Sequence, residues 1–299
     1  MQQPEMSYFE WTQRFSTREA CLEEVARHRW PNGFLCPRCG HDHAHVLARD
    51  AKRQCAHCRY QVSVTAGTLF HKTHVPLPKW FAAIYLMSAD KGGISALRLS
   101  KLIGVSWPTA YRMLRLLRQA MRDRDRTYPL SGLIEVDDAF VGGKRPGKRG
   151  RGAQGKTPVL FAVEQRGKAA GYLAATVLPE GVKQAAVAEF ARRHLAPGSA
   201  LRSDALPALR SLGRSHAHEA RVTPPEEAGE WLPKVHLIIA NFKRFLLGTF
   251  HGVGPRYLGE YLDEFVYRFN RRHWEAQLPQ RLLETAVAHV PIRTRAAVS

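Results

Sequence analysis

Two pairs of cysteines near the start of the chain constrain its fold more than any other sequence feature. Cys36 and Cys39 stand in FLCPRCGH, Cys55 and Cys58 stand in RQCAHCRY, and fifteen residues separate the two C-x2-C pairs. Each pair fits a tight turn that points two thiolates at one place, and this spacing is typical of a structural four-cysteine zinc site. A ribbon of this size buries little apolar surface, so we expect Zn²⁺ to supply much of its folding free energy.

Other readings of the cysteines are weaker. Two redox pairs, or four buried free thiols, leave the paired spacing in a reducing compartment unexplained. The single Cys21 lies in the helical pattern TREACLEEVARHRW and is expected to be a buried apolar residue. Nearby histidines could replace a cysteine as ligands, although four cysteines already complete a site; they are His41, His43, His45 and His57.

The charge of the chain points to a polyanionic partner. Lys and Arg outnumber Asp and Glu by 45 to 26, which gives a net charge of +19 over 299 residues. A protein of a membrane surface could share this charge, but no apolar run reaches the ~18 residues needed to span a bilayer. The start MQQPEMSYFEWTQRF lacks the features of a signal peptide. We therefore expect a cytoplasmic protein, associated with the nucleoid, that binds nucleic acid and no membrane.

Residues 78 to 121 have the apolar spacing of several short helices. The stretch SALRLSKLIGVSWPTAYRMLRLLRQ predicts a helix, a turn at Gly104, and a second helix with Ser106 as its cap and Pro108 in its first turn. This is the pattern of a helix-turn-helix, although an ordinary helical hairpin fits it too. In a helix-turn-helix the start of the second helix enters the major groove of DNA. The candidate DNA contacts there are Trp107, Thr109 and Arg112.

From Leu130 the pattern changes to extended runs, LIEVDDAFVGG, TPVLFAVEQ and GYLAATVL, which predict three neighbouring strands. A helix, the run ALRSDA, a short helix and the extended piece EARVTPP follow, which predicts an α/β layer with a mixed sheet. Asp137 lies inside the first apolar strand and Asp204 ends the fourth. A single such acid is usually a turn residue, but two on adjacent strands would converge on a gap that fits a divalent metal ion.

At this point the chain resembles the IS1595 family of transposases with the ISXO2-like catalytic domain. The resemblance is carried by VDDAFVGGK, RSDA, CRYQVSVTAGTLFHKTHVPLPKW and NFKRFLLGTFHGVGPRYLGEYLDEFVYRFNRR, and it covers residues 15 to 275. It implies an RNase H-like, retroviral-integrase-like fold that cuts and joins DNA with two Mg²⁺ or Mn²⁺ ions. By this similarity Asp137 matches the first catalytic acid and Asp204 the second.

At the position where the family pattern has its third acid, this chain has no carboxylate residue. Many related transposases carry a glutamate followed seven residues later by a lysine; here His236 and Lys243 stand at these places. Seven residues bring a helix back to nearly the same face, whereas Asn241 would point ~200° away from Lys243. The chain also resembles a variant that counts this asparagine as catalytic, and a helix starting only near Ile239 would relax the conflict. As candidates for the third catalytic residue, His236 and Asn241 rank level and Glu264 ranks behind them. Lys243 is expected to contact a phosphate.

Two basic stretches are candidates for gripping DNA. The first, GGKRPGKRGRGAQGK, lies between the first two strands, and the second, VYRFNRRHW, follows the last predicted site helix and includes Arg268. The first could instead be a solvated charged turn, but in an enzyme that acts on DNA we favour contacts to phosphates. The second suits contacts to the DNA backbone, although its aromatic residues could simply be core. The candidates are Lys144, Arg145, Lys148, Arg149, Arg151, Arg271 and Arg272.

Together these patterns predict four segments. They are an N-terminal helix with the zinc ribbon (1–75), a helix-turn-helix region (76–127), an RNase H-like catalytic domain (128–280) and a C-terminal tail (281–299). The expected function is transposition of an insertion sequence: binding of double-stranded DNA at terminal inverted repeats and in the target, then metal-dependent cleavage and strand transfer by a homo-oligomer. The alternatives are a DNA-binding regulator without catalysis and an inactive transposase remnant.

Overall fold

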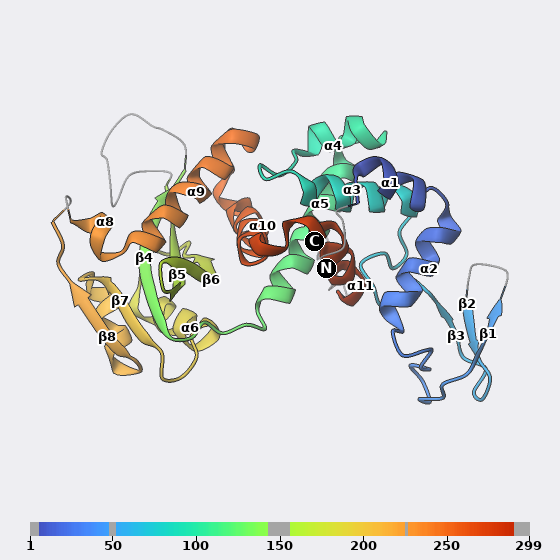
Figure 1. Cartoon of the computed structure of the whole chain (residues 1–299), viewed down its shortest axis with the longest axis horizontal. Coiled ribbons are helices and arrows are strands. Elements are labelled where there is room, and N and C mark those ends of the chain that lie inside the picture. Colours follow the sequence, from blue (N-terminus) through green and yellow to red (C-terminus); the bar gives the residue numbers. More distant parts are fainter. Residues whose placement is uncertain (1–5, 48–51, 143–155, 225–226, 290–299) are drawn as a thin grey trace, which may run out of the picture. The chain divides into compact units, whose positions relative to one another are not determined.

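The computed structural model describes residues 6–47, 52–142, 156–224 and 227–289 (Figure 1). The chain divides into two compact units. The first consists of Met1–Ala120 with Trp274–Ser299, and the second of Met121–His273. The sequence patterns predict a boundary between the ribbon (1–75) and the helical region (76–127), whereas the first unit contains the ribbon together with the helical region as far as Ala120.

Helix α3 organises the first unit because it is apolar almost all round. Its side chains Trp80, Phe81, Ile84 and Met87 are buried, as expected of a helix surrounded by others. Ser7 begins the first helix with a capping box. Four further helices pack against α3. The five are α1 (Tyr8–Arg14), α2 (Arg18–Arg29), α3 (Leu77–Ala89), α4 (Ala96–Ile103) and α11 (Leu278–Ala288).

Helix α11 occupies much of the segment predicted to be a C-terminal tail. Leu282, Leu283 and Ala286 are fully buried, and the carbonyl of Ala286 accepts a hydrogen bond from the N–H of Leu69 at 3.0 Å. The residues of α11 have an ordinary amphipathic pattern, but no local signal shows that its partner lies some 200 residues earlier in the chain. The described part of the segment is therefore core of the first unit.

The first unit also contains the small ribbon and the pair of helices expected to bind DNA. The ribbon is an antiparallel sheet of β1 (Ala44–Leu47), β2 (Lys52–Cys55) and β3 (Gln61–Ser63), in that order. Helix α4 (Ala96–Ile103) ends at Gly104, whose φ of 60° is the left-handed conformation that glycine adopts at little cost. Helix α5 (Trp107–Asp125) begins after Ser106, whose Oγ accepts the N–H of Thr109. The two predicted helices and the turn at Gly104 are thus present, and their DNA-binding role stays a prediction.

The second unit is built on a mixed five-stranded sheet. Its order is β6-β5-β4-β7-β8; β5 runs antiparallel to both neighbours, while β4, β7 and β8 are mutually parallel. This topology is RNase H-like, so the expected fold class is confirmed, as are the three strands followed by strand-helix units. The strands are β4 (Leu133–Val141), β5 (Thr157–Arg166), β6 (Ala169–Val177), β7 (Ala200–Asp204) and β8 (Ala217–Arg221).

Helices cover both faces of this sheet (Figure 1). Side chains alternate along a strand, so on β5 Phe161 packs against α9 and α10, whereas Leu160 and Ala162 pack against α6. The long helices are α6 (Gln184–His194), α9 (Pro233–Phe250) and α10 (Leu258–Asn270). Short helical turns complete the chain: α7 (Pro207–Arg210), η2 (Ser211–Arg214), α8 (Ala228–Trp231), η3 (Pro255–Tyr257) and η4 (Arg272–Gln277).

None of the helices in the described ranges is both long enough and apolar enough to cross a bilayer. Even α9, with 18 residues, carries cations along its exposed side, among them Lys243 and Arg244.

Candidate active site and zinc site

Three aspartates converge where two neighbouring strands run side by side. Strands β4 and β7 are parallel, and their register pairs Val136 with Ser203, which sets Asp137 beside Asp204. Asp137, Asp138 and Asp204 each offer a carboxylate oxygen, and these three oxygens lie within 4.8 Å of one another. The strand adjacency on which the predicted acid pair depends is therefore present.

Local backbone hydrogen bonds orient two of these carboxylates. The N–H of Asp138 donates to Oδ1 of Asp137 at 2.8 Å, and the N–H of Leu206 donates to Oδ1 of Asp204 at 3.1 Å. The sequence patterns did not single out Asp138, because adjacent strand residues normally point to opposite faces. The doublet DD in LIEVDDAF was the signal that could have found it.

His236 of helix α9 contacts one member of this cluster, Asp137. Its Nε2 lies 3.1 Å from Oδ2 of Asp137, and its side chain is 35% exposed. Helix α9 begins at Pro233, three residues before His236, so a start near Ile239 is wrong and the face shared by His236 and Lys243 is that of a regular helix. Lys243 is exposed on this face.

Asn241 lies on the other flank of the same helix. Five residues rotate a regular helix by about 140° and advance it about 7.5 Å. The buried residues Val235, Ile239 and Phe242 face the sheet, and helical geometry places His236 and Asn241 on opposite sides of this buried stripe. Of the two candidates, His236 is the one seen to contact Asp137, and which of them acts in the site stays a prediction.

Glu264, the third candidate, is a buried residue of α10. Its side chain is fully buried, and its Oε1 accepts a hydrogen bond from Nε of Arg268 at 3.2 Å. Glu264 and Arg268 thus form an i,i+4 ion pair inside the unit and not on its surface. Among the described residues, Glu264 is not part of the carboxylate cluster of Asp137, Asp138 and Asp204.

Glu135 is a further residue that the sequence patterns missed. It is fully buried on β4, two residues before Asp137, and its Oε2 accepts the N–H groups of Lys234 and Val235, each at 2.8 Å. These are N–H groups of the first turn of α9, a helix with no side-chain cap of its own. A carboxylate is stabilised at a helix N-terminus, so Glu135 fixes α9, with His236, against the strand that carries Asp137.

Removing this buried cap is expected to destabilise the second unit. Glu135→Ala leaves the part-buried N–H group of Lys234 and the buried N–H group of Val235 without this acceptor, which should cost about 2–4 kcal/mol. Thermal unfolding and amide hydrogen exchange at Lys234 and Val235 measure the effect; we expect a lower Tm and lost protection at both amides. Glu219→Ala, at an exposed acid of β8, is the matched control. Equal Tm values for the two variants would contradict the capping role.

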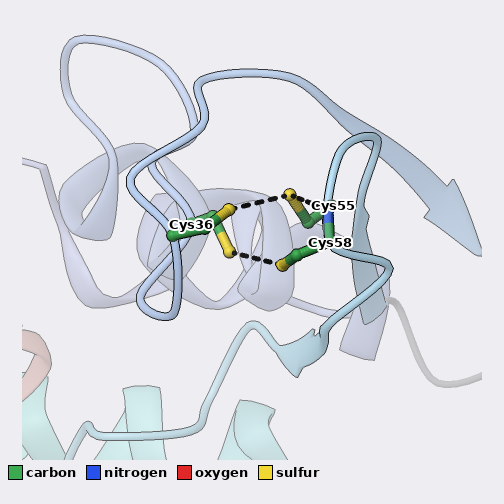
Figure 2. Close-up of side chains that lie close together, drawn as sticks. Cys36, Cys55 and Cys58 are labelled. Atoms are coloured by element: carbon green, nitrogen blue, oxygen red, sulfur yellow. Dashed lines mark hydrogen bonds between the residues drawn. The ribbon is translucent and has the colours of Figure 1, made fainter.

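The four cysteines form a compact cluster. Figure 2 labels three of them, Cys36, Cys55 and Cys58. The Sγ atoms of Cys36 and Cys58 are 3.6 Å apart, as are those of Cys39 and Cys55. Thiolates bound tetrahedrally to zinc at about 2.3 Å lie about 3.8 Å from one another, so the separation fits Zn²⁺.

The two cysteine turns have the same backbone design. In one, the N–H of Gly40 donates to the carbonyl of Cys36; in the other, the N–H of Arg59 donates to the carbonyl of Cys55. Both Gly40 and Arg59 have a left-handed backbone, with φ of 73° and 57°. Cys21 lies apart from the cluster, and burial raises its pKa to about 12, as expected of an inert core thiol.

The candidate DNA contacts of the helix-turn-helix are accessible. Trp107 is 51% exposed and stacks on Tyr111, with ring centroids 5.1 Å apart and planes 9° from parallel. Arg112 is exposed, and the hydroxyl of Thr109 bonds to Ser106 Oγ at 2.9 Å. The start of α5 therefore presents a flat apolar ring and a cation to solvent.

Two arginines expected to contact DNA are instead engaged inside the second unit. Arg271 is buried, donates to Oδ1 of Asp125 at 2.7 Å and lies over the ring of Tyr267. Arg272 donates to the carbonyls of Phe269 and Ala170, and burial lowers its pKa. The ion pair with Asp125 engages the guanidinium group of Arg271, and backbone carbonyls engage that of Arg272, so contacts of these two arginines with DNA stay a prediction. The other basic candidates, Lys144, Arg145, Lys148, Arg149 and Arg151, lie outside the described residues.

Two family models match the segments that contain the carboxylate cluster and the four cysteines. Residues 129–270 match the ISXO2-like transposase domain, and residues 16–61 match the transposase zinc-ribbon domain of the same family. The chain belongs to the IS1595 family of transposases. The first of these segments contains the three aspartates and His236, and the second contains all four cysteines.

Among the proteins similar to this chain are one relative and two solved structures. It is 31% identical over 173 residues to an uncharacterized protein in transposable element ISH50 of Halobacterium salinarum, a match that spans 51% of this chain and 56% of that protein. A chain of the Mos1 strand transfer complex is similar with a TM-score of 0.30 and 14% identity, over 74% of this chain and 82% of that one. A Mos1 transposase paired-end complex gives a TM-score of 0.27, with 14% identity over 70% and 78%.

Proposed function

We propose that this chain is the transposase of an insertion sequence, which binds the terminal inverted repeats and catalyses metal-dependent DNA cleavage and strand transfer. The observation that carries the proposal is the set of three carboxylates on parallel strands β4 and β7. Oxygens that bind one octahedral Mg²⁺ lie about 3–4 Å apart, and carboxylates are the donors that Mg²⁺ and Mn²⁺ prefer, so the residues present fit the ion.

Asp137, Asp138, Asp204 and His236 would hold the divalent ions. Bound ions supply Lewis-acid stabilisation of the attacking and leaving oxygens of a phosphodiester. The protein's part is to hold the carboxylates in place through the N–H groups of Asp138 and Leu206, and to fix His236 through the cap on α9. Water and then a freed 3′-hydroxyl are the nucleophiles of the two proposed steps.

The rest of the chain supplies DNA recognition in this proposal. The net charge of +19 favours a polyanion, and the exposed start of α5 offers Trp107 and Arg112 to the major groove. Double-stranded DNA is the partner, both as element ends and as target. Because two ends must be joined, we propose that the chain acts as a homo-oligomer on DNA, in the cytoplasm and at the nucleoid.

A cleavage assay tests the proposal. The purified full chain is incubated with labelled duplexes that carry the element's ends and with Mg²⁺ or Mn²⁺, and strand products are resolved by length. We expect cleavage at the element end, joining to a target duplex, and complete loss of both with a chelator. Specific retention of the ends with no product under either metal would instead identify a DNA-binding regulator or an inactive remnant.

His236 and Asn241 are expected to differ in their effect on this reaction. His236→Ala removes the imidazole 3.1 Å from Asp137 and should slow cleavage by about 100-fold. Asn241→Ala, on the opposite flank of α9, should change the rate by only a few fold. Single-turnover cleavage measures both variants, with DNA retention as the control for folding. A larger loss for Asn241→Ala would reassign the third position.

A further inference from the structure

A hollow of ≈ 510 Å³ lies where strand β4 ends and helix α9 ends. Its size is that of a pocket for a small molecule or a single nucleobase, since ligand pockets span about 300–1,000 Å³. Most of its lining is apolar. The lining residues that matter here are Phe140 and Val141 of β4, Leu246 and Leu247 of α9, and Val253 beyond it.

The hollow also has two nitrogen-bearing side chains. Lys243 and His251 line it, so a ligand with flat apolar faces and a nearby negative charge fits better than a purely apolar one. Leu247 is 64% exposed, which leaves an apolar side chain on the surface of the hollow in an otherwise strongly basic chain.

The hollow and the carboxylate cluster are built on the same two elements. Phe140 follows Asp137 by three residues of extended strand, which is about 10 Å. Lys243 follows His236 by seven residues of helix, which is also about 10 Å. The hollow therefore lies about 10 Å beyond the aspartates along both β4 and α9. DNA with its scissile phosphate at the aspartates would place neighbouring nucleotides at the hollow.

The end of α9 gives the hollow its last wall. His251 closes the helix in a left-handed conformation, with φ of 53°, and Gly252 follows with φ of 125°, which few residues other than glycine adopt. This reversal lets Val253 line the same hollow as Leu246. The stretch LLGTFHGV thus forms one wall of the hollow, a role that is separate from the carboxylate cluster.

We infer that this hollow binds one nucleobase that is drawn out of the DNA stack beside the scissile phosphate. The apolar walls contact the faces of the base, and Lys243 contacts the phosphate next to it. The inference rests on the proposed function, because it is the carboxylate cluster that would hold the scissile phosphate nearby. A base already displaced from its stack exposes the phosphate that the cluster must reach.

Base fluorescence tests the inference. The cleavage assay first locates the cut; 2-aminopurine then replaces single bases on either side of it, in duplexes bound by an Asp204→Asn variant that leaves the DNA intact. Unstacking raises 2-aminopurine fluorescence, and we expect a severalfold rise at one position only. If the wild-type chain cleaves this DNA but no position brightens, the hollow does not take a base, although the proposed function stands. No cleavage at all would count against the proposed function itself.

A matched pair of variants assigns the effect to the hollow. Leu247→Ser alters its lining, while Leu237→Ser changes a similarly exposed leucine, 55% exposed, that lies elsewhere on α9. Loss of one base contact should weaken cleavage about tenfold in Leu247→Ser and abolish the fluorescence rise, with Leu237→Ser unchanged. An abasic nucleotide at the bright position should make Leu247→Ser and wild type equal. A changed oligomeric state without a fluorescence change would show that the hollow binds protein, and would overturn the inference.

Discussion

Asp137→Asn is expected to abolish DNA cleavage while leaving DNA retention unchanged. The substitution keeps the shape of the side chain but removes the anionic oxygen that a divalent ion needs, so we expect the cleavage rate to fall at least about 1,000-fold, or ~4 kcal/mol of transition-state stabilisation. Asp204→Asn should have the same effect, because its carboxylate completes the same cluster. Single-turnover cleavage of labelled element ends, beside a filter-retention assay, separates catalysis from binding.

A surface acid of the same unit is the control for this prediction. Glu180 is exposed and pairs only with Lys183 among the described residues, so Glu180→Gln should cleave at the wild-type rate. Near-normal cleavage by either aspartate variant would contradict the proposed metal site. Loss of cleavage together with loss of thermal stability would instead reveal a folding defect, which the Tm of each variant detects.

Removal of zinc is expected to unfold the ribbon. The sheet β1–β3 has few buried residues, and two of those in the ribbon, Cys36 and Cys55, are ligands themselves, so metal binding must replace an apolar core. Binding of structural Zn²⁺ contributes about 10–16 kcal/mol in small zinc domains. We expect one equivalent of zinc in native mass spectra, and loss of amide protection across β1–β3 after chelation or in Cys55→Ser.

Cys21 provides the matched control for the zinc prediction. It is a buried cysteine of the same unit but lies outside the cluster, so Cys21→Ala should keep the full equivalent of zinc. A zinc content that is unchanged in Cys55→Ser, or lost in Cys21→Ala, would contradict the four-cysteine site.

Much of this architecture is predictable from sequence because it depends on local spacing. The paired cysteines fix two equivalent turns, and alternating apolar runs fix the strands. The acids Asp137 and Asp204 could be singled out because a charged residue in an apolar strand incurs a desolvation cost unless it has a partner. The helical period alone likewise predicts that His236 and Lys243 share one face.

The remaining features depend on contacts between distant segments. Glu135 looks like one more acid in an apolar strand, and its task is visible only once α9, about 100 residues later, points its N-terminus at it. Arg271 looks free to bind phosphate until Asp125, nearly 150 residues earlier, is seen beside it. Likewise, the contact between His236 and Asp137 depends on where α9 begins and on which side of that helix faces β4, and neither is visible in the sequence.

A manganese-soaked crystal of the full chain tests the central claim most directly. Anomalous scattering locates Mn²⁺ independently of the protein atoms. The account predicts a peak between the carboxylates of Asp137 and Asp204, with oxygens of both residues about 2.1–2.3 Å from it. A peak elsewhere in the chain, or full manganese occupancy in crystals of Asp137→Asn at that same position, would contradict the shared metal site on which the proposed function depends.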